Sequence, residues 1–189
     1  MIKGVPPVRR IVVGDVEPKK PAIFSDGPSP DVRGDPARPG FGITRIWVTE
    51  DTPAPVKGVR ETLHLPHTLE PPVDGSVCRY ITIPPDASWM GAINEDKVRS
   101  FFAAMGSPDA CHYQAGVAHP YMQRTETLDY VYVLDGSVTL VLDAEEVELQ
   151  EGDAVVQRGA RHAWSNRTAA PCTLIISSHH GTNDTKSNG

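Results

Sequence analysis

The sequence QRTETLDY at residues 123–130 begins the stretch that decides the fold, and GARHAWSN at residues 159–166 ends it. Between them lie short β-branched runs that are separated by glycine turns at Gly136 and Gly152. Short strands with closely spaced turn signals are typical of a β-barrel or β-sandwich. The stretch therefore predicts a small barrel in which Asp129 and His162 converge on a polar interior site.

The same signals extend outward along the chain. Alternating or β-branched runs predict strands at residues 8–13, 21–24, 41–50, 76–83, 128–134, 137–142, 146–149, 153–157, 162–166 and 172–178. Residues 25–41 are rich in Gly, Pro and Asp, which predicts a connecting loop. The chain is therefore expected to be all-β apart from a single helix.

That helix is expected between Asn94 and Gly106. Asn94 can cap its first turn, and Gly106 can end it. An apolar stripe at helical spacing indicates a packing face rather than a cofactor site; it comprises Val98, Phe101, Phe102 and Met105.

Bulk composition limits the class of protein. The 189 residues, 39% hydrophobic and 22% charged, are enough for one globular domain with a sizeable core. A net charge of −6 without a basic run argues against nucleic-acid binding, and no apolar stretch is long enough for a membrane span. Cys78, Cys111 and Cys172 are too scattered for a metal motif and predict unpaired thiols. With no signal-peptide pattern, a cytoplasmic protein is expected.

Two motifs in the C-terminal half resemble those of the cupin family. The first cupin motif has two histidines one residue apart, then an acid, then a glycine seven residues later. Here those positions hold Gln123, Thr125, Asp129 and Gly136, so both histidines are replaced.

The second cupin motif is better preserved. It runs from a Gly-Asp pair to a Gly-x-x-His-x-x-x-Asn pattern, found here as Gly152-Asp153, Gly159, His162 and Asn166. The resemblance implies a cupin jelly roll, that is, a double-stranded β-helix barrel with an N-terminal strand extension and one short helix. It also implies that residues 1–117 complete the barrel, that 118–180 form the cupin core, and that the protein is a homodimer. Residues 181–189 are polar and are expected to be disordered.

Strand alternation predicts which side chains share the interior. His119, Tyr121, Gln123 and Thr125 are expected on one face. Tyr121, Val131, Val133 and Trp164 would form apolar walls around Gln123, Thr125, Asp129 and His162. A barrel of about eight strands can hold one small ligand, so a small-molecule substrate is expected.

The resemblance raises the question of a metal. Cupins hold Fe, Mn, Ni or Zn with three histidines and a carboxylate, a donor set that suits such divalent ions. This chain offers Gln123, Asp129 and His162 at those positions, with His119 as a possible substitute. That set gives weak support for a divalent metal.

The metal-free interpretation is acid–base catalysis. His162 would act as general acid or base with Asp129 as its partner, while Gln123 and Thr125 bind the substrate. Such a pair suits a dehydratase, decarboxylase or isomerase acting on an oxygenated organic compound, for example in secondary metabolism. Two alternatives remain open at this point: a non-haem metal-dependent oxygenase, and a cupin that binds a small molecule without turning it over. Purely structural roles for Asp129 and Trp164 also remain open.

Overall fold

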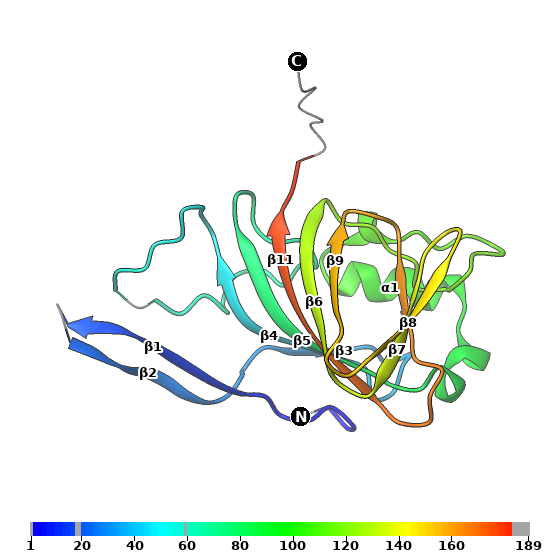
Figure 1. Ribbon diagram of the computed structural model, residues 1–189, viewed down its shortest axis with the longest axis horizontal. Helices are drawn as coiled ribbons and strands as arrows, with labels where there is room; N and C mark the ends of the chain where they lie inside the picture. Colours follow the sequence, from blue (N-terminus) through cyan, green and yellow to red (C-terminus); the bar gives the residue numbers. More distant parts are fainter. Residues whose placement is uncertain (1, 18–19, 59, 183–189) are drawn as a thin grey trace, which may run out of the picture.

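A computed structural model of the chain describes residues 2–17, 20–58 and 60–182. Within these residues, antiparallel strands curve into a barrel that a helix covers on one side (Figure 1). The strands are β1 Arg9–Glu17, β2 Lys20–Pro28, β3 Val32–Gly34, β4 Gly42–Thr49, β5 Ser76–Ile83, β6 Thr127–Asp135, β7 Ser137–Val141, β8 Glu146–Gln150, β9 Ala154–Arg158, β10 Ala163–Ser165 and β11 Cys172–His180. The helices are α1 Glu95–Ala104 and the 3-10 turns η1 Asp86–Ser88, η2 Met90–Ala92 and η3 Pro108–Ala110.

Two sheets build the barrel. The larger has six strands in the order β3-β4-β5-β11-β6-β9, and the smaller has three in the order β10-β7-β8. Their inner faces meet in one apolar cluster, to which the large sheet contributes Val131 and Leu174 and the small sheet contributes Val138 and Leu140. This arrangement confirms the predicted all-β jelly roll.

The predicted strands of the C-terminal half are all present, with ends that shift by one or two residues. The turn between β6 and β7 shows why glycine stands there. Gly136 has a φ of +79°, and a Cβ at this position would lie 2.9 Å from the carbonyl oxygen of Pro171. A larger residue would strain the turn and collide with backbone.

The prediction of a loop over residues 25–41 was wrong in part. β2 continues to Pro28, and residues 32–34 form β3. Pairing with β1 extends β2, since Arg9 and Arg10 lie opposite Pro28 and Gly27 in an antiparallel register. The Pro and Gly content predicted a loop, but two-stranded pairing tolerates both residues at a strand end.

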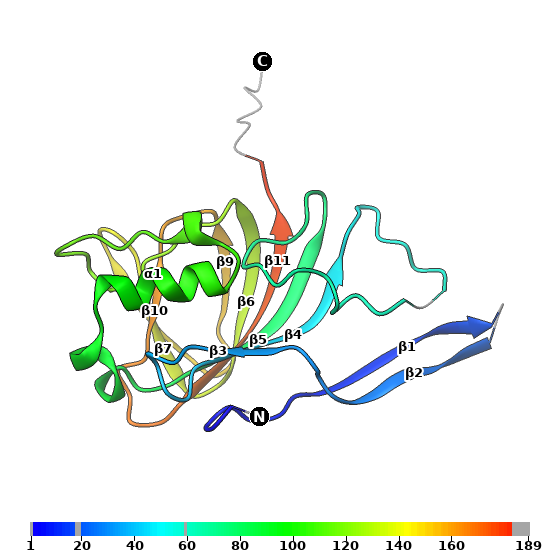
Figure 2. The same cartoon turned by 180° about the vertical axis from the view of Figure 1, so that it is seen from behind.

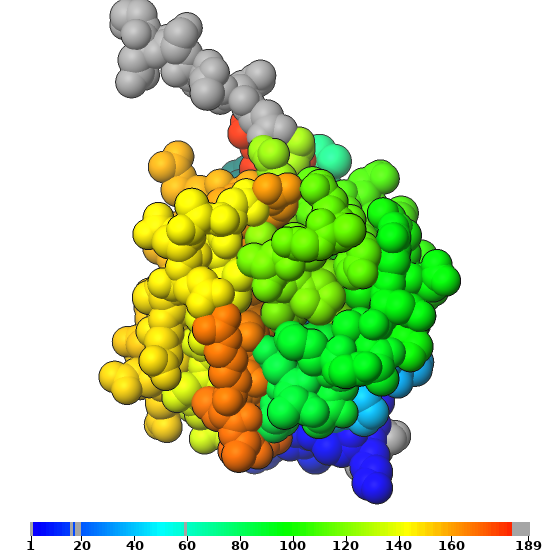
Figure 3. All heavy atoms as spheres, turned by 90° about the vertical axis from the view of Figure 1, so that its right-hand side faces the viewer, coloured from blue at the N-terminus to red at the C-terminus, as the bar shows by residue number. Residues whose placement is uncertain are grey.

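The predicted helix is confirmed. Asn94 accepts a hydrogen bond from the backbone N–H of Lys97 at 3.0 Å, and Gly106 follows the helix with a φ of +66°. Its apolar stripe packs over the large sheet in a second cluster; this cluster includes Phe41, Ile43, Leu69, Trp89, Val98, Phe101, Phe102, Met105 and Tyr121. Figure 3 shows the green middle part of the chain and the yellow and orange C-terminal segments side by side on this end of the molecule.

The N-terminal extension has two parts. β3, β4 and β5 belong to the large sheet, next to β11. β1 and β2 instead form a separate hairpin that extends away from the barrel (Figures 1 and 2). Of the tail predicted to be disordered, residues 183–189 lie outside the described residues. No helix in the described ranges is long and apolar enough to cross a membrane.

Candidate active site

A cavity of about 60 Å³ lies where the two apolar clusters meet. This volume is several times the ~10–15 Å³ that one water molecule requires. Phe41, Ile43 and Phe101 come from the helix-side cluster, and Val131 and Trp164 come from the cluster between the sheets. The cavity is therefore the interior of the barrel, and its walls are mostly apolar.

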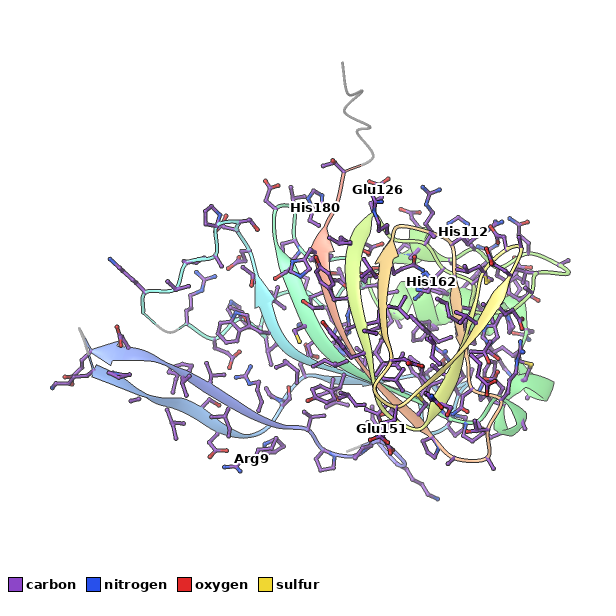
Figure 4. All side chains as sticks on the ribbon, in the orientation of Figure 1. Arg9, His112, Glu126, Glu151, His162 and His180 are labelled. Atoms are coloured by element: carbon purple, nitrogen blue, oxygen red, sulfur yellow. The ribbon has the colours of Figure 1, made fainter. Side chains whose placement is uncertain are left out.

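His162 lies in this cavity just before β10, within the outline of the barrel in Figure 4. Its backbone exchanges two hydrogen bonds with Gln123, at 2.8 and 2.9 Å, and this isolated bridge brings the two cupin motifs together. The Nδ1 atom lies 2.9 Å from the carbonyl oxygen of Ala160, which can only accept, so Nδ1 carries the proton. The opposite atom, Nε2, is therefore free to accept, and the Gln123 side-chain amide lies 3.3 Å from it.

The pKa of His162 is lowered from its usual value. Burial is the largest cause, because it disfavours the charged imidazolium, and the residue is only 3% exposed. The Ala160 carbonyl and the charge of Asp129 act in the opposite direction but do not offset burial. The imidazole is thus held neutral, with a lone pair available at Nε2.

Asp129 lies on β6 opposite Ser178 of β11 and Gln157 of β9. Its side chain lines the same cavity as His162, and its Oδ1 atom is buried without a hydrogen-bond partner. Asp129 acts on His162 through its charge, which favours the imidazolium, whereas Ala160 sets the orientation of the ring. Asp129, the predicted partner of His162, therefore contributes charge but not the orientation of the ring.

Most of the other predicted site residues also line the cavity; they are Tyr121, Gln123, Thr125, Val131 and Trp164. Val133 does not. It lies farther along β6 and packs in the apolar cluster between the sheets, with 2% of its surface exposed.

His119 is likewise outside the cavity. Its ring packs against Trp89, with centroids 5.8 Å apart, and its Nε2 lies 3.8 Å from Asp86. The prediction assumed an extended segment, but the backbone N–H of Met122 bonds to the His119 carbonyl and closes a turn. The alternation of side chains between two faces fails across that turn. Met122 would lie on the face opposite His119 in an extended strand, but it is fully buried.

Two buried arginines of the cavity were missed. Arg79 lies on β5, where Val77, Arg79 and Ile81 alternate inward. The sequence did contain a signal for Arg79, because an arginine at an inward position of an apolar strand indicates a buried charge. Arg38 comes from the turn before β4, and no periodicity predicts the direction of its side chain.

Arg38 is enclosed by aromatic rings. Its guanidinium carbon lies 3.7 Å from the ring centre of Phe41 and 3.5 Å from that of Tyr121, which allows cation–π contact with both. Its Nε donates to Asp35 at 2.7 Å, and the Tyr121 hydroxyl donates to the same carboxylate at 2.7 Å. These contacts fix one wall of the cavity.

The donors at the cupin metal positions do not fit a centre of three imidazoles and a carboxylate. One position holds an imidazole, His162, and one holds a carboxylate, Asp129. Thr125 Oγ1 lies 2.7 Å from the Thr127 hydroxyl, and the Gln123 side-chain amide is turned toward the imidazole. Across the described part of the chain, no three His, Cys, Asp or Glu side chains group to hold a metal.

Four cavity-lining residues each present a buried polar atom without a partner. They are the donors Arg38 Nη2, Arg79 Nε and Trp164 Nε1, and the acceptor Asp129 Oδ1. Buried polar groups are almost always hydrogen-bonded, so unpaired ones around a cavity indicate groups that a ligand or water would satisfy.

Comparison with known proteins agrees with this architecture. The family model of the cupin domain matches residues 109–178. Over 138 residues the chain is 32% identical to phomopsin biosynthesis cluster protein C' of Diaporthe leptostromiformis, a match that covers 68% of this chain and 66% of that protein. It is 29% identical over 127 residues to the cupin-domain-containing oxidoreductase virC of Hypocrea virens, covering 65% of this chain and 49% of that protein.

Among solved structures, the chain is similar to a cupin 2 conserved barrel domain protein from Salinispora arenicola CNS-205. The TM-score is 0.42 and the identity 12%, over 79% of this chain and 81% of that one. The chain belongs to the cupin superfamily, as a small cupin-domain protein. It spans about two thirds of the phomopsin cluster protein and about half of the oxidoreductase.

Proposed function

We propose that this cupin is a small-molecule enzyme of secondary metabolism in which His162 transfers protons to and from the substrate. The observation that carries the proposal is a neutral imidazole whose Nδ1 proton is held by Ala160, so that Nε2 is a base inside an apolar cavity. The phomopsin relative is named as a biosynthesis cluster protein, which supports the metabolic setting.

The reaction begins with loss of a proton from a carbon next to a carbonyl. Nε2 of His162 takes the proton, and the C–H electron pair moves toward the carbonyl oxygen to form an enolate. The unpaired Trp164 N–H is a donor available to that oxygen, and the charge of Asp129 stabilises the new imidazolium.

Two complete reactions can follow from this enolate. In an isomerase acting on a β,γ-unsaturated carbonyl compound, the imidazolium returns the proton to the γ carbon, the double bond moves into conjugation and the carbonyl is restored. In a dehydratase, the enolate expels a hydroxyl group from the β carbon, and the imidazolium protonates this hydroxyl group so that it leaves as water. The Gln123 amide must first give way to the substrate, and its 3.3 Å contact with Nε2 is long enough to be weak.

Deuterium incorporation tests this function across a mixture of candidate substrates. The protein is incubated in D2O with the small-molecule extract of its source organism, and compounds that gain deuterium at carbon or lose water are identified by mass spectrometry. His162→Gln should reduce incorporation by about 10²–10⁴-fold. His112→Gln is the matched control, because His112 does not line the cavity, and it should retain incorporation. Equal incorporation by wild type and His162→Gln contradicts the proposal.

One observation favours a second candidate, a metal-dependent oxidoreductase, since the virC relative is named as an oxidoreductase. The donor set, with a single imidazole and a single carboxylate at the cupin metal positions, argues against it. Metal analysis of the purified protein, together with turnover before and after chelation, separates the two. A third candidate, a binding protein without activity, predicts that a bound compound is recovered chemically unchanged and without deuterium.

A further inference from the structure

Arg79 is a buried cation that the proposed proton transfer does not use. It projects from β5 into the cavity and is 4% exposed. Its Nη2 donates to the carbonyl oxygen of Leu69 at 2.5 Å and to the hydroxyl of Ser178 at 2.8 Å. Its Nε remains buried without a partner. The side chain is therefore held in place while its Nε–H is left unpaired at the cavity.

The two cavity arginines differ in how their charges are balanced. Arg38 is paired directly with Asp35 at 2.7 Å. Among the described residues no carboxylate oxygen comes within 4.0 Å of the Arg79 guanidinium; Asp129 and Glu70 act on it only from farther away. Of the two lining arginines, only Arg79 therefore lacks an anion in direct contact within the described part of the chain.

A buried cation without a close anion is costly, and a ligand anion placed against it would offset that cost. The guanidinium is a planar fork that matches a carboxylate. A single cation without a direct counter-ion suits a monoanion better than a dianion such as phosphate. The surrounding walls are apolar, with Leu69, Ile81 and Ile176 among them, so they suit a hydrocarbon body.

Asp129 adds a second recognition element. Its unpaired Oδ1 accepts but cannot donate when ionised, so it calls for a hydroxyl rather than a second anion. Asp129 also lies within electrostatic reach of both Arg79 and His162, which places the three groups around one space.

We propose that Arg79 binds the carboxylate of a small hydroxy acid with a mainly apolar body, whose hydroxyl donates to Asp129. Ser178 and the Leu69 carbonyl position the guanidinium. The proposal deepens the proposed function, because it names the substrate class for the same cavity. Binding can nevertheless be measured with a compound that cannot undergo the proposed proton transfer.

The probe is 2-hydroxy-2-methylpropanoate, which carries no hydrogen on the carbon next to its carboxylate. Its neutral counterpart is the corresponding amide. Calorimetry on the full chain should show that the acid binds at least about tenfold more tightly than the amide, as expected for a hydrogen bond between charged groups. The ¹⁵N-detected Nε–H signal of Arg79 should shift on addition of the acid and not of the amide.

Single substitutions test whether Arg79 causes the preference for the acid over the amide. Arg79→Met removes the charge but keeps apolar volume, and it should abolish the preference for the acid. Arg33→Met is the matched control, since Arg33 is half exposed on β3 and does not line the cavity. If Arg79→Met fails to fold, Ser178→Ala should weaken acid binding several-fold, whereas Ser177→Ala, outside the cavity, should not.

His162→Gln separates this proposal from the proposed function, because it should retain the acid preference even if all activity is lost. The carboxylate site is overturned if the acid binds no better than the amide, if folded Arg79→Met keeps the tenfold preference, or if inorganic phosphate binds more tightly than the acid.

Discussion

Asp35→Asn should destabilise the protein strongly, because it leaves the Arg38 guanidinium buried without its anion. The Asp35 side chain is 2% exposed and that of Arg38 is 6% exposed. The carboxylate accepts from Arg38 Nε at 2.7 Å, from the Tyr121 hydroxyl at 2.7 Å and from the backbone N–H of Ala37 at 2.9 Å. An asparagine has nearly the same volume, so the change removes charge rather than packing.

The expected magnitude follows from breaking one side of a buried ion pair, which costs about 3–5 kcal/mol. For a chain of this length, that corresponds to a fall in Tm of roughly 6–20 °C. The loss would also loosen the wall that Phe41 and Tyr121 form with Arg38. Ligand binding should therefore weaken together with stability.

Urea unfolding followed by tryptophan fluorescence measures the free energy of unfolding. The matched control is Asp26→Asn, because the Arg9–Asp26 pair has the same 2.7 Å separation but is exposed. Exposed pairs contribute little, so this control should leave the midpoint nearly unchanged. The double variant Asp35→Asn/Arg38→Met removes both charges and should recover most of the lost stability. The reasoning is refuted if Asp35→Asn costs no more than the exposed control, or if the double variant shows no recovery.

Three further outcomes are expected. Because burial lowers the pKa of His162, the unfolded chain binds a proton at this imidazole more readily than the folded protein does. Stability should therefore fall as the pH drops below about 6.5. In thermal unfolding from pH 8 to 5, the Tm of His162→Gln should fall less than that of the wild type, and an equal fall contradicts a buried neutral imidazole. The predicted homodimer would use the β1–β2 hairpin, where Val13 and Ile23 lie opposite each other and are 68% and 63% exposed. The double variant Val13→Glu/Ile23→Glu should therefore be monomeric by analytical ultracentrifugation. Val56→Glu is the control, because Val56 is 85% exposed but lies outside the hairpin, and it should leave the measured mass unchanged. Asn166→Ala should lower the free energy of unfolding in urea by about 1–3 kcal/mol but leave binding of a small acid intact. The fully buried Asn166 side chain bonds only to backbone and to a nearby threonine, and it lies outside the cavity. Lost binding without lost stability would assign Asn166 to the site instead.

The sequence alone was sufficient for the architecture of the C-terminal half. Its strands are short and alternate regularly, and its turns need glycine, so local signals and the cupin motifs agree. The alternation along β6 also placed Asp129 and Val131 inward, and both are buried in the structure. Prediction was less accurate where the chain is irregular. The turn at residues 119–122 moved His119 out of the cavity, and pairing of β1 with β2 replaced part of an expected loop.

The sequence by itself determined the jelly roll and the capped helix, and it predicted that His162 and Asp129 share one interior, because each depends on periodicity or on motif spacing. Only the tertiary structure decided the charge balance of the cavity. Arg38 and Arg79 enter it from a turn and from a strand far from both motifs. Asp35, three residues before Arg38, holds the first, whereas Leu69 and Ser178, which lie 10 and 99 residues from Arg79, hold the second. Burial and pairing depend on contacts between residues distant in sequence, so local patterns cannot reveal which buried donors remain unpaired.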